Sequence, residues 1–136
     1  MSDDISFEDN AQASPKSVLI VEDDAPDLVL ARKKVKSLWP DCVVMPVRSL
    51  KAVHKAYAKH KFDLVLLDLN LPDGFGPRTV EDIRKIDKNV PIIVVSGMVS
   101  DGTVSECLKL GANNVVPKSQ LMGNDFFNIL KQNFSG

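Results

Sequence analysis

The sequence DLVLLDLNLPDG, at residues 63–74, places an uninterrupted apolar run directly before a polar turn. The run at 64–67 lacks the apolar-polar alternation of a half-exposed strand, so it predicts a strand that is covered on both faces of a sheet. Comparable runs, the last of them weaker, lie at residues 18–21, 42–45, 92–95 and 115–116. Segments with apolar residues three and four positions apart separate these runs, and this alternation is typical of repeated βα units.

Five such units predict a fold of the α/β class. Parallel neighbours need helical crossovers, and these are right-handed, so we expect a doubly wound five-stranded parallel sheet, strand order 2-1-3-4-5, with five helices. Asp24 and Ser49 are the expected N-caps of the first two helices. The third helix should follow residues 76–77 and the fifth should begin at Asn124, while Gly111 should end the fourth in the left-handed conformation.

Composition and charge limit the classes of partner. The chain has 136 residues, of which 44% are hydrophobic, and this suits one domain with its own core. A formal charge of -1 gives no broad basic surface for nucleic acid, and no run of about 18 apolar residues could cross a membrane. Residues 1–16 predict a flexible acidic tail and residues 17–136 the domain. Because the N-terminus lacks a secretory signal pattern, we expect a cytoplasmic protein.

Polar side chains follow the apolar runs at the points where the predicted strands end. Glu22 and Asp23 follow the first run, Asp68 follows the third, Ser96 ends the fourth and Lys118 comes after the fifth. The carboxyl ends of parallel strands share one edge of a sheet, and the first and third strands are neighbours at the switch point. We therefore expect the three carboxylates to converge there, with Ser96 and Lys118 beside them.

Carboxylates gathered at one edge repel each other, by roughly 4 kcal/mol per pair at about 4 Å and an effective dielectric near 20. A shared proton or a hard divalent cation would relieve this repulsion. Mg2+ suits the site better, because it takes a few oxygen ligands and keeps its waters for a phosphate. The predicted ligands are Glu22, Asp23, Asp68 and the backbone carbonyl of Asn70.

The remaining groups favour phosphoryl chemistry. Lys118 supplies a second positive charge and the Ser96 hydroxyl can donate to an anion, so the pocket suits a phosphoryl group. An aspartate carboxylate is a nucleophile toward phosphorus when cations neutralise the phosphoryl oxygens. Asp68 is the candidate nucleophile.

Four segments in this order and spacing resemble the receiver domain of two-component response regulators. They are VLIVEDD at 18–24, DLVLLDLNLPDG at 63–74, PIIVVSG at 91–97 and LGANNVVPKS at 110–119. The resemblance spans about residues 17–134 and implies a flavodoxin-like fold. It also implies that Asp68 is the phosphorylated aspartate, that Glu22 and Asp23 form the acidic pair, with Asp23 the more direct Mg2+ ligand, and that Ser96 and Lys118 are the family's hydroxyl and lysine residues.

Three positions depart from the pattern that this family shows. Glu22 replaces a common aspartate, and its longer arm predicts a water-mediated metal contact. Ser119 follows Lys118 where many receivers have a proline in a cis bond, so we expect a trans peptide there. Val115 stands where many receivers have a switch aromatic, so the hydroxyl-aromatic rearrangement cannot operate in its usual form.

The leading hypothesis is a stand-alone receiver that takes a phosphoryl group from a sensor histidine kinase or a phosphotransfer protein and binds Mg2+. It catalyses only its own phosphorylation and dephosphorylation, and its output is contact with an unidentified effector protein. Because the chain ends at Gly136, directly after the fifth predicted helix, we expect that effector to be a separate molecule, and the receiver to be a monomer or weak dimer. Two alternatives stay open: a pseudo-receiver adaptor that is never phosphorylated, and a haloacid-dehalogenase-like phosphatase, whose second carboxylate would fall at Asn70.

Overall fold

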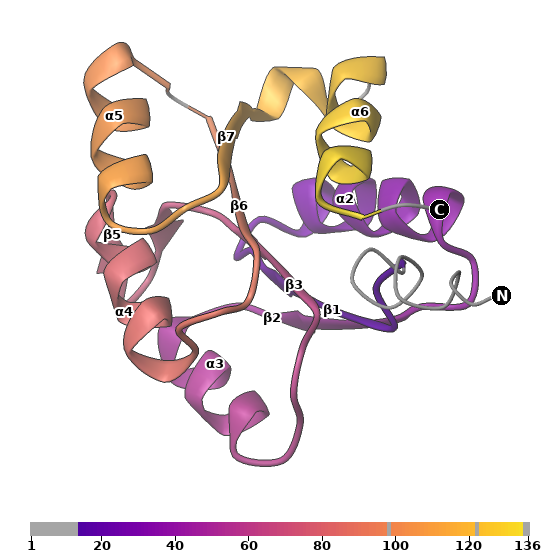
Figure 1. The fold of residues 1–136 in the computed structure, drawn as a ribbon. Helices are drawn as coiled ribbons and strands as arrows, with labels where there is room; N and C mark the ends of the chain where they lie inside the picture. The colour runs from indigo at the N-terminus through magenta and orange to yellow at the C-terminus, as the bar shows by residue number, and fades with distance from the viewer. Residues whose placement is uncertain (1–13, 98, 122, 135–136) are drawn as a thin grey trace, which may run out of the picture.

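A five-stranded parallel sheet runs through the middle of the molecule in the computed structural model, which describes residues 14–97, 99–121 and 123–134 (Figure 1). Its strand order is β2-β1-β3-β6-β7, which confirms the predicted order 2-1-3-4-5, because the short strands β4 and β5 form a separate hairpin. The strands of the main sheet are β1 (Ser17–Val21), β2 (Val43–Val47), β3 (Leu64–Leu67), β6 (Ile92–Ser96) and β7 (Asn114–Pro117).

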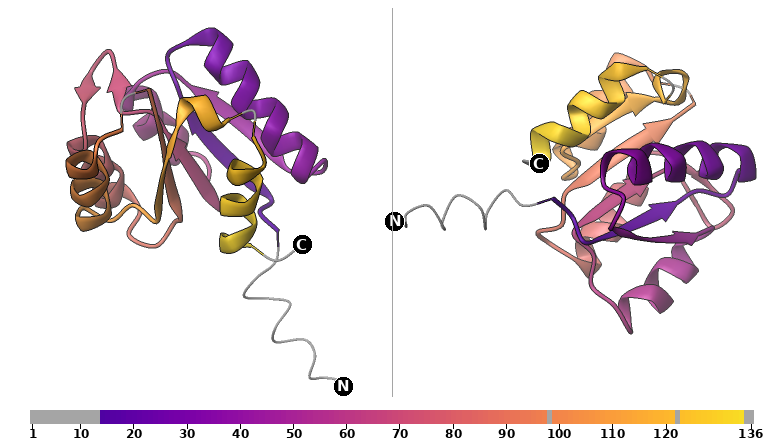
Figure 2. Two further views of the ribbon diagram at one scale, coloured as in Figure 1. Left: turned by 90° about the horizontal axis from the view of Figure 1, so that it is seen from above. Right: turned by 90° about the vertical axis from the view of Figure 1, so that its right-hand side faces the viewer.

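Five helices cover the two faces of this sheet. They are α2 (Ala25–Leu38), α3 (Leu50–Tyr57), α4 (Arg78–Ile86), α5 (Asp101–Lys109) and α6 (Asn124–Asn133). Figure 2 shows α2 and α3 on opposite sides of the sheet, with α6 on the side of α2. No helix in the described ranges is long and apolar enough to cross a membrane.

The apolar strand residues pack into two hydrophobic cores, one on each face of the sheet. In β3, Val65 and Leu67 pack on the α3, α4 and α5 side, while Leu64 and Leu66 pack on the α2 and α6 side. All four side chains are at most 2% exposed. Successive side chains of a strand point to opposite faces, so a strand buried on both sides needs an apolar residue at every position. This explains the absence of alternation in the sequence.

The helix ends follow the expected local signals. The Asp24 carboxylate accepts a hydrogen bond from the Asp27 N–H at 3.0 Å and caps α2, and the Ser49 hydroxyl accepts from Ala52 and caps α3. Gly111 has φ +119° beyond the end of α5, a conformation that side-chain-bearing residues rarely adopt. The predicted start of the last helix at Asn124 is confirmed.

Two short segments differ from the expectations. Strand β2 continues to Val47 instead of ending at residue 45, and Pro46 is tolerated there because β2 is an edge strand and can lack an N–H on its open side. Residues 70–75 form a hairpin of β4 (Asn70–Leu71) and β5 (Gly74–Phe75) where only a turn was expected. Strands of two residues are too short to show a period in the sequence.

At the N-terminal side, residues 1–13 of the predicted tail lie outside the described residues. Lys16, which the same prediction includes in the tail, is hydrogen-bonded next to β1. Its N–H donates to the Asp63 carboxylate at 2.8 Å, and its carbonyl accepts from the Val43 N–H at 2.8 Å.

Candidate functional site

The carboxyl ends of β1 and β3 place two acidic side chains next to each other. The Glu22 N–H donates to the Val47 carbonyl at 3.0 Å, and the Asp68 N–H donates to the Val21 carbonyl at 2.9 Å. The parallel hydrogen bonding of the sheet thus continues one residue beyond each strand. Both carboxylates are buried, because Glu22 is 5% and Asp68 4% exposed. The backbone therefore fixes two buried acids side by side at the switch point of the sheet.

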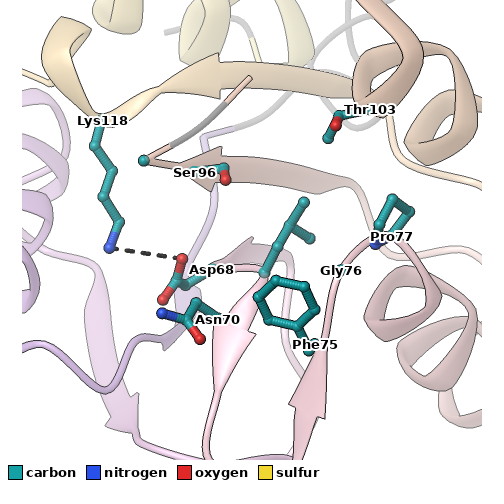
Figure 3. Close-up of a pocket in the computed structure, with 10 residues that line it drawn as sticks. Asp68, Asn70, Phe75, Gly76, Pro77, Ser96, Thr103 and Lys118 are labelled. Atoms are coloured by element: carbon teal, nitrogen blue, oxygen red, sulfur yellow. Dashed lines mark ion pairs between the residues drawn. The ribbon is translucent and has the colours of Figure 1, made fainter. Parts of the chain in front are cut away.

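Lys118 reaches these acids from the end of β7. Its ammonium nitrogen lies 3.1 Å from Glu22 Oε1 and 3.5 Å from Asp68 Oδ1. A third carboxylate, Asp27 in the first turn of α2, lies at 2.8 Å and is the closest of the three. Figure 3 shows the Lys118 side chain extended toward Asp68. The lysine therefore holds together three acids from three different segments.

The surroundings of the cluster raise the pKa values of both Glu22 and Lys118. Burial, together with the neighbouring charge of Asp68, raises the pKa of the Glu22 carboxyl to about 7, against hydrogen bonds from the Asp24 N–H and from Lys118. Burial alone would lower the pKa of Lys118, but its hydrogen bonds to Asp27 and Glu22 and the charge of Asp68 outweigh that effect and raise it. Lys118 therefore stays charged, while Glu22 gains or loses its proton near neutral pH.

Asp23 lies at the open side of the cluster and pairs with a different cation. The Arg48 guanidinium, which follows β2, donates to the Asp23 carbonyl at 2.9 Å, and its Nε lies 3.5 Å from Asp23 Oδ1. Both side chains are about half exposed or more, so water screens this pair. Four carboxylates therefore contact two cations, which leaves an excess of two negative charges when all four acids are ionised.

A cavity of about 370 Å³ opens above Asp68 (Figure 3). The predicted site residues Asp68, Asn70, Ser96 and Lys118 all line it. Ser96 is buried at the end of β6. At the mouth lies the ring of Phe75, which is 79% exposed. The remaining lining residues are Leu69, Gly76, Pro77, Gly97 and Thr103.

The structure thus brings most of the predicted residues together and adds two that were missed. Glu22 joins the group through Lys118, while Asp23 sits beside it with Arg48. The sequence contained a signal for Asp27, because it lies three residues after the N-cap Asp24, in the first turn of the helix that begins at this edge of the sheet. Arg48 offered none beyond its place after a strand.

No three acidic, histidine or cysteine side chains in the described ranges stand arranged to hold a metal ion. The acidic side chains instead contact basic groups: Lys118 lies beside Glu22 and Asp68, and Arg48 lies beside Asp23. The donor set still suits Mg2+, since it consists of hard oxygen atoms with excess negative charge.

The register of the β4–β5 hairpin sets the direction of the Asn70 carbonyl. The Gly76 N–H donates to the Leu69 carbonyl at 2.7 Å, which makes these two residues a hydrogen-bonded pair. The adjacent antiparallel pair, Asn70 with Phe75, is then non-hydrogen-bonded, and its carbonyls point away from the hairpin ladder. The Asn70 carbonyl is therefore directed away from Phe75.

Comparison with known proteins shows which family this chain is similar to. A family model described as the response regulator receiver domain matches residues 18–125. The chemotaxis protein CheY of Thermotoga maritima is 32% identical over 103 residues, which cover 76% of this chain and 85% of that protein. Transcription factor SKN7 of Saccharomyces cerevisiae is 30% identical over 101 residues, 74% of this chain but only 16% of that longer protein.

Two solved structures share the fold and a quarter of the sequence. The phosphorylated cyanobacterial phytochrome response regulator RcpA matches with a TM-score of 0.69 and 26% identity, over 86% of this chain and 89% of that one. The Mn(2+)-bound form of the response regulator Rcp1 matches with a TM-score of 0.70 and 26% identity, over 87% of this chain and 91% of that one.

Proposed function

This chain belongs to the response regulator receiver family, and from that premise we propose that it accepts a phosphoryl group on Asp68 from a phosphohistidine of a sensor kinase or phosphotransfer protein. The observation that supports this most is the cavity that Asp68 shares with Ser96 and Lys118. A buried carboxylate beside a charged lysine and a hydroxyl suits phosphoryl transfer, which depends on positioning and on neutralising charge at the phosphoryl oxygens. The domain proposed to carry this activity is residues 17–136.

In the proposed transfer, an oxygen of the Asp68 carboxylate attacks phosphorus while the bond from phosphorus to the imidazole nitrogen breaks. The imidazole leaves with the electron pair of that bond and takes a proton from solvent. Lys118, already within 3.5 Å of Asp68, offsets the negative charge that the phosphoryl group brings. The Ser96 hydroxyl, in the same cavity, is the proposed donor to a phosphoryl oxygen.

Mg2+ is part of the proposal as the cofactor. Asp23, Asp68 and the Asn70 carbonyl would hold it, with Glu22 acting through water, and the ion would supply positive charge to the phosphoryl oxygens. The excess of negative charge in the carboxylate cluster supports this assignment, as does the outward direction of the Asn70 carbonyl. Arg48 and Lys118 would have to yield part of their contacts to the ion.

The proposed output is a change of binding partner. Receiver domains are signalling domains, and we infer that this one acts as a stand-alone monomer or weak dimer whose phosphorylation alters contact with an unidentified effector protein. Val115, at the family's switch-aromatic position, packs against the core on the α3, α4 and α5 side. We infer that the signal travels through Ser96 and the loop after β6, without an aromatic partner at position 115.

Intact-mass measurement after incubation with acetyl phosphate and Mg2+ tests the phosphorylation. We expect one added phosphoryl group on the unchanged protein and none on Asp68→Asn. Unmodified protein would contradict the proposal and favour the pseudo-receiver adaptor. Continuous release of phosphate from a generic ester, without a stoichiometric adduct, would favour the phosphatase.

A further inference from the structure

Asp27 has no place in the mechanism above, yet it makes the shortest ion pair of the site. Its Oδ2 atom lies 2.8 Å from the Lys118 nitrogen, against 3.1 Å for the Glu22 pair and 3.5 Å for the Asp68 pair. Hydrogen bonds run from the ammonium to Asp27 and to Glu22. The contact with Asp68 is the longest of the three.

The pair is well sheltered for an ion pair near a surface. The Asp27 side chain is 27% exposed and that of Lys118 19%. Asp27 is itself held in place, because its N–H donates to the capping carboxylate of Asp24 at 3.0 Å in the first turn of α2. A partly buried pair on a rigid helix turn loses less to solvent screening and side-chain entropy than an exposed pair does.

Phosphorylation of Asp68 would present Lys118 with a second strong attraction. A phosphoryl group carries close to two negative charges and several acceptor oxygens, and it would sit on the carboxylate that the lysine contacts least closely. Each contact that the ammonium makes toward α2 then competes with a contact toward the phosphoryl group.

We propose that Asp27 is a positioning residue that holds Lys118 toward α2 in the unphosphorylated protein and opposes its transfer to the phosphoryl group. This inference rests on the proposed function of Asp68. Asp27 touches neither phosphorus nor the reacting oxygen, so it acts only through the lysine. Its effect is to favour the resting state of the site over the phosphorylated one.

The test compares Asp27→Asn with Asp24→Asn. Both variants remove one negative charge from the same helix turn, and asparagine caps a helix about as well as aspartate. Of these two aspartates, only Asp27 has a described contact with Lys118, while the Asp24 side chain caps α2. Asp24→Asn therefore controls for the general loss of charge, and thermal unfolding of both variants confirms that the fold persists.

The first measurement is the affinity for beryllofluoride, a phosphoryl mimic, in the presence of Mg2+ by titration calorimetry. Asp27→Asn should bind it about fivefold more tightly than the unchanged protein, Asp24→Asn should bind it as the unchanged protein does, and Asp27→Glu should restore most of the original affinity. Equal or weaker binding by Asp27→Asn would overturn the inference.

The second measurement needs no ligand. An amine-reactive reagent should modify Lys118 faster in Asp27→Asn than in either the unchanged protein or Asp24→Asn, as followed by peptide mass spectrometry. An unchanged rate would overturn the inference. If the unchanged protein binds no beryllofluoride, the proposed function fails, and the modification rate still decides whether Asp27 restrains the lysine.

Discussion

Two half-buried cations tie distant segments together at opposite edges of the sheet, and they do so with different partners. Lys118, at the carboxyl edge, contacts three carboxylates. Arg84 of α4, at the amino edge, donates to the carbonyls of Gly111 at 2.8 Å, Val90 at 2.6 Å and Asp87 at 3.1 Å. Carbonyl groups keep the same charge at every pH, whereas carboxylates titrate and repel each other. The amino edge is thus a structural joint, and the carboxyl edge keeps charges that a ligand can rearrange.

The largest expected effect comes from breaking the structural joint. Arg84→Met removes donors from carbonyls that link α4 to the segments before β6 and β7, so we expect a loss of about 3 kcal/mol in the free energy of unfolding. Because the acceptors do not titrate, the loss should be similar at about pH 5 and about pH 8. Chemical denaturation at both pH values measures it. A loss confined to one pH would contradict the comparison.

Removing the cation at the carboxyl edge should lower the free energy of unfolding by an amount that depends on pH. Lys118→Met leaves the buried Glu22 and Asp68 carboxylates without their cation, which should cost about 2 kcal/mol near pH 8. The pKa of Glu22 is already raised to about 7, so near pH 5 the folded protein holds its proton and the loss should shrink.

The sign follows from proton binding. The folded state binds more protons than the unfolded chain between the two pKa values of Glu22, so stability falls as the pH rises through that window. The same denaturation series measures this. If Lys118→Met lowered the free energy of unfolding equally at the two pH values, the contribution of Lys118 would be independent of pH, as that of Arg84 is expected to be, and the comparison would be wrong.

A third change tests the contact between Arg84 and the Gly111 carbonyl by altering Gly111. At Gly111, with φ +119°, an added Cβ would lie 2.9 Å from Arg84 Nε. Gly111→Ala should therefore lower the free energy of unfolding by about 1 to 2 kcal/mol, from backbone strain and from displacement of the guanidinium. Gly102→Ala is the matched control, because its Cβ meets only Ser100 Oγ at 3.9 Å within the helix α5. A thermal melt should show that variant unchanged or slightly stabilised.

The smallest effect concerns an acid near the carboxyl edge that has neutral partners. The Asp73 carboxylate accepts hydrogen bonds from the N–H groups of Leu50 at 2.8 Å and Lys51 at 3.0 Å, and these lower its pKa. Its contribution is present above the ordinary aspartate pKa and is lost as the pH falls through the lowered value. Because the group is exposed, Asp73→Ala should cost under about 1 kcal/mol at neutral pH and less in acid. A cost that grows in acid would contradict this sign.

The fold was predictable because its signals are local or periodic. The run at 64–67 is apolar at every position because two cores need it, and Asp24 and Ser49 cap helices through their own backbone neighbours. The convergence of Glu22 and Asp68 followed from parallel topology alone. These features depend on which residues are adjacent in the chain or in the sheet.

The contacts that the sequence did not predict are made by the charged ends of long basic side chains with residues far away in the sequence. Asp27 lies in the first turn of a predicted helix, but its partner Lys118 is 91 residues away in the sequence, so their contact depends on the packing of the folded chain. Arg48 contacts Asp23 at a sheet edge that no periodicity marks. Arg84 binds backbone carbonyls, which every residue possesses, so nothing in the sequence identifies its partners. The hairpin at 70–75 consists of strands too short to form a pattern.

The central claim is that Asp68 captures phosphorus at the carboxyl edge, and chemical trapping of the adduct tests it most directly. Borohydride reduces an acyl phosphate to the alcohol with loss of phosphate, so treatment after incubation with acetyl phosphate and Mg2+ should convert Asp68 to homoserine. Peptide mass mapping should find that change at residue 68 alone. Homoserine at another acidic position, or none at all, would contradict the account.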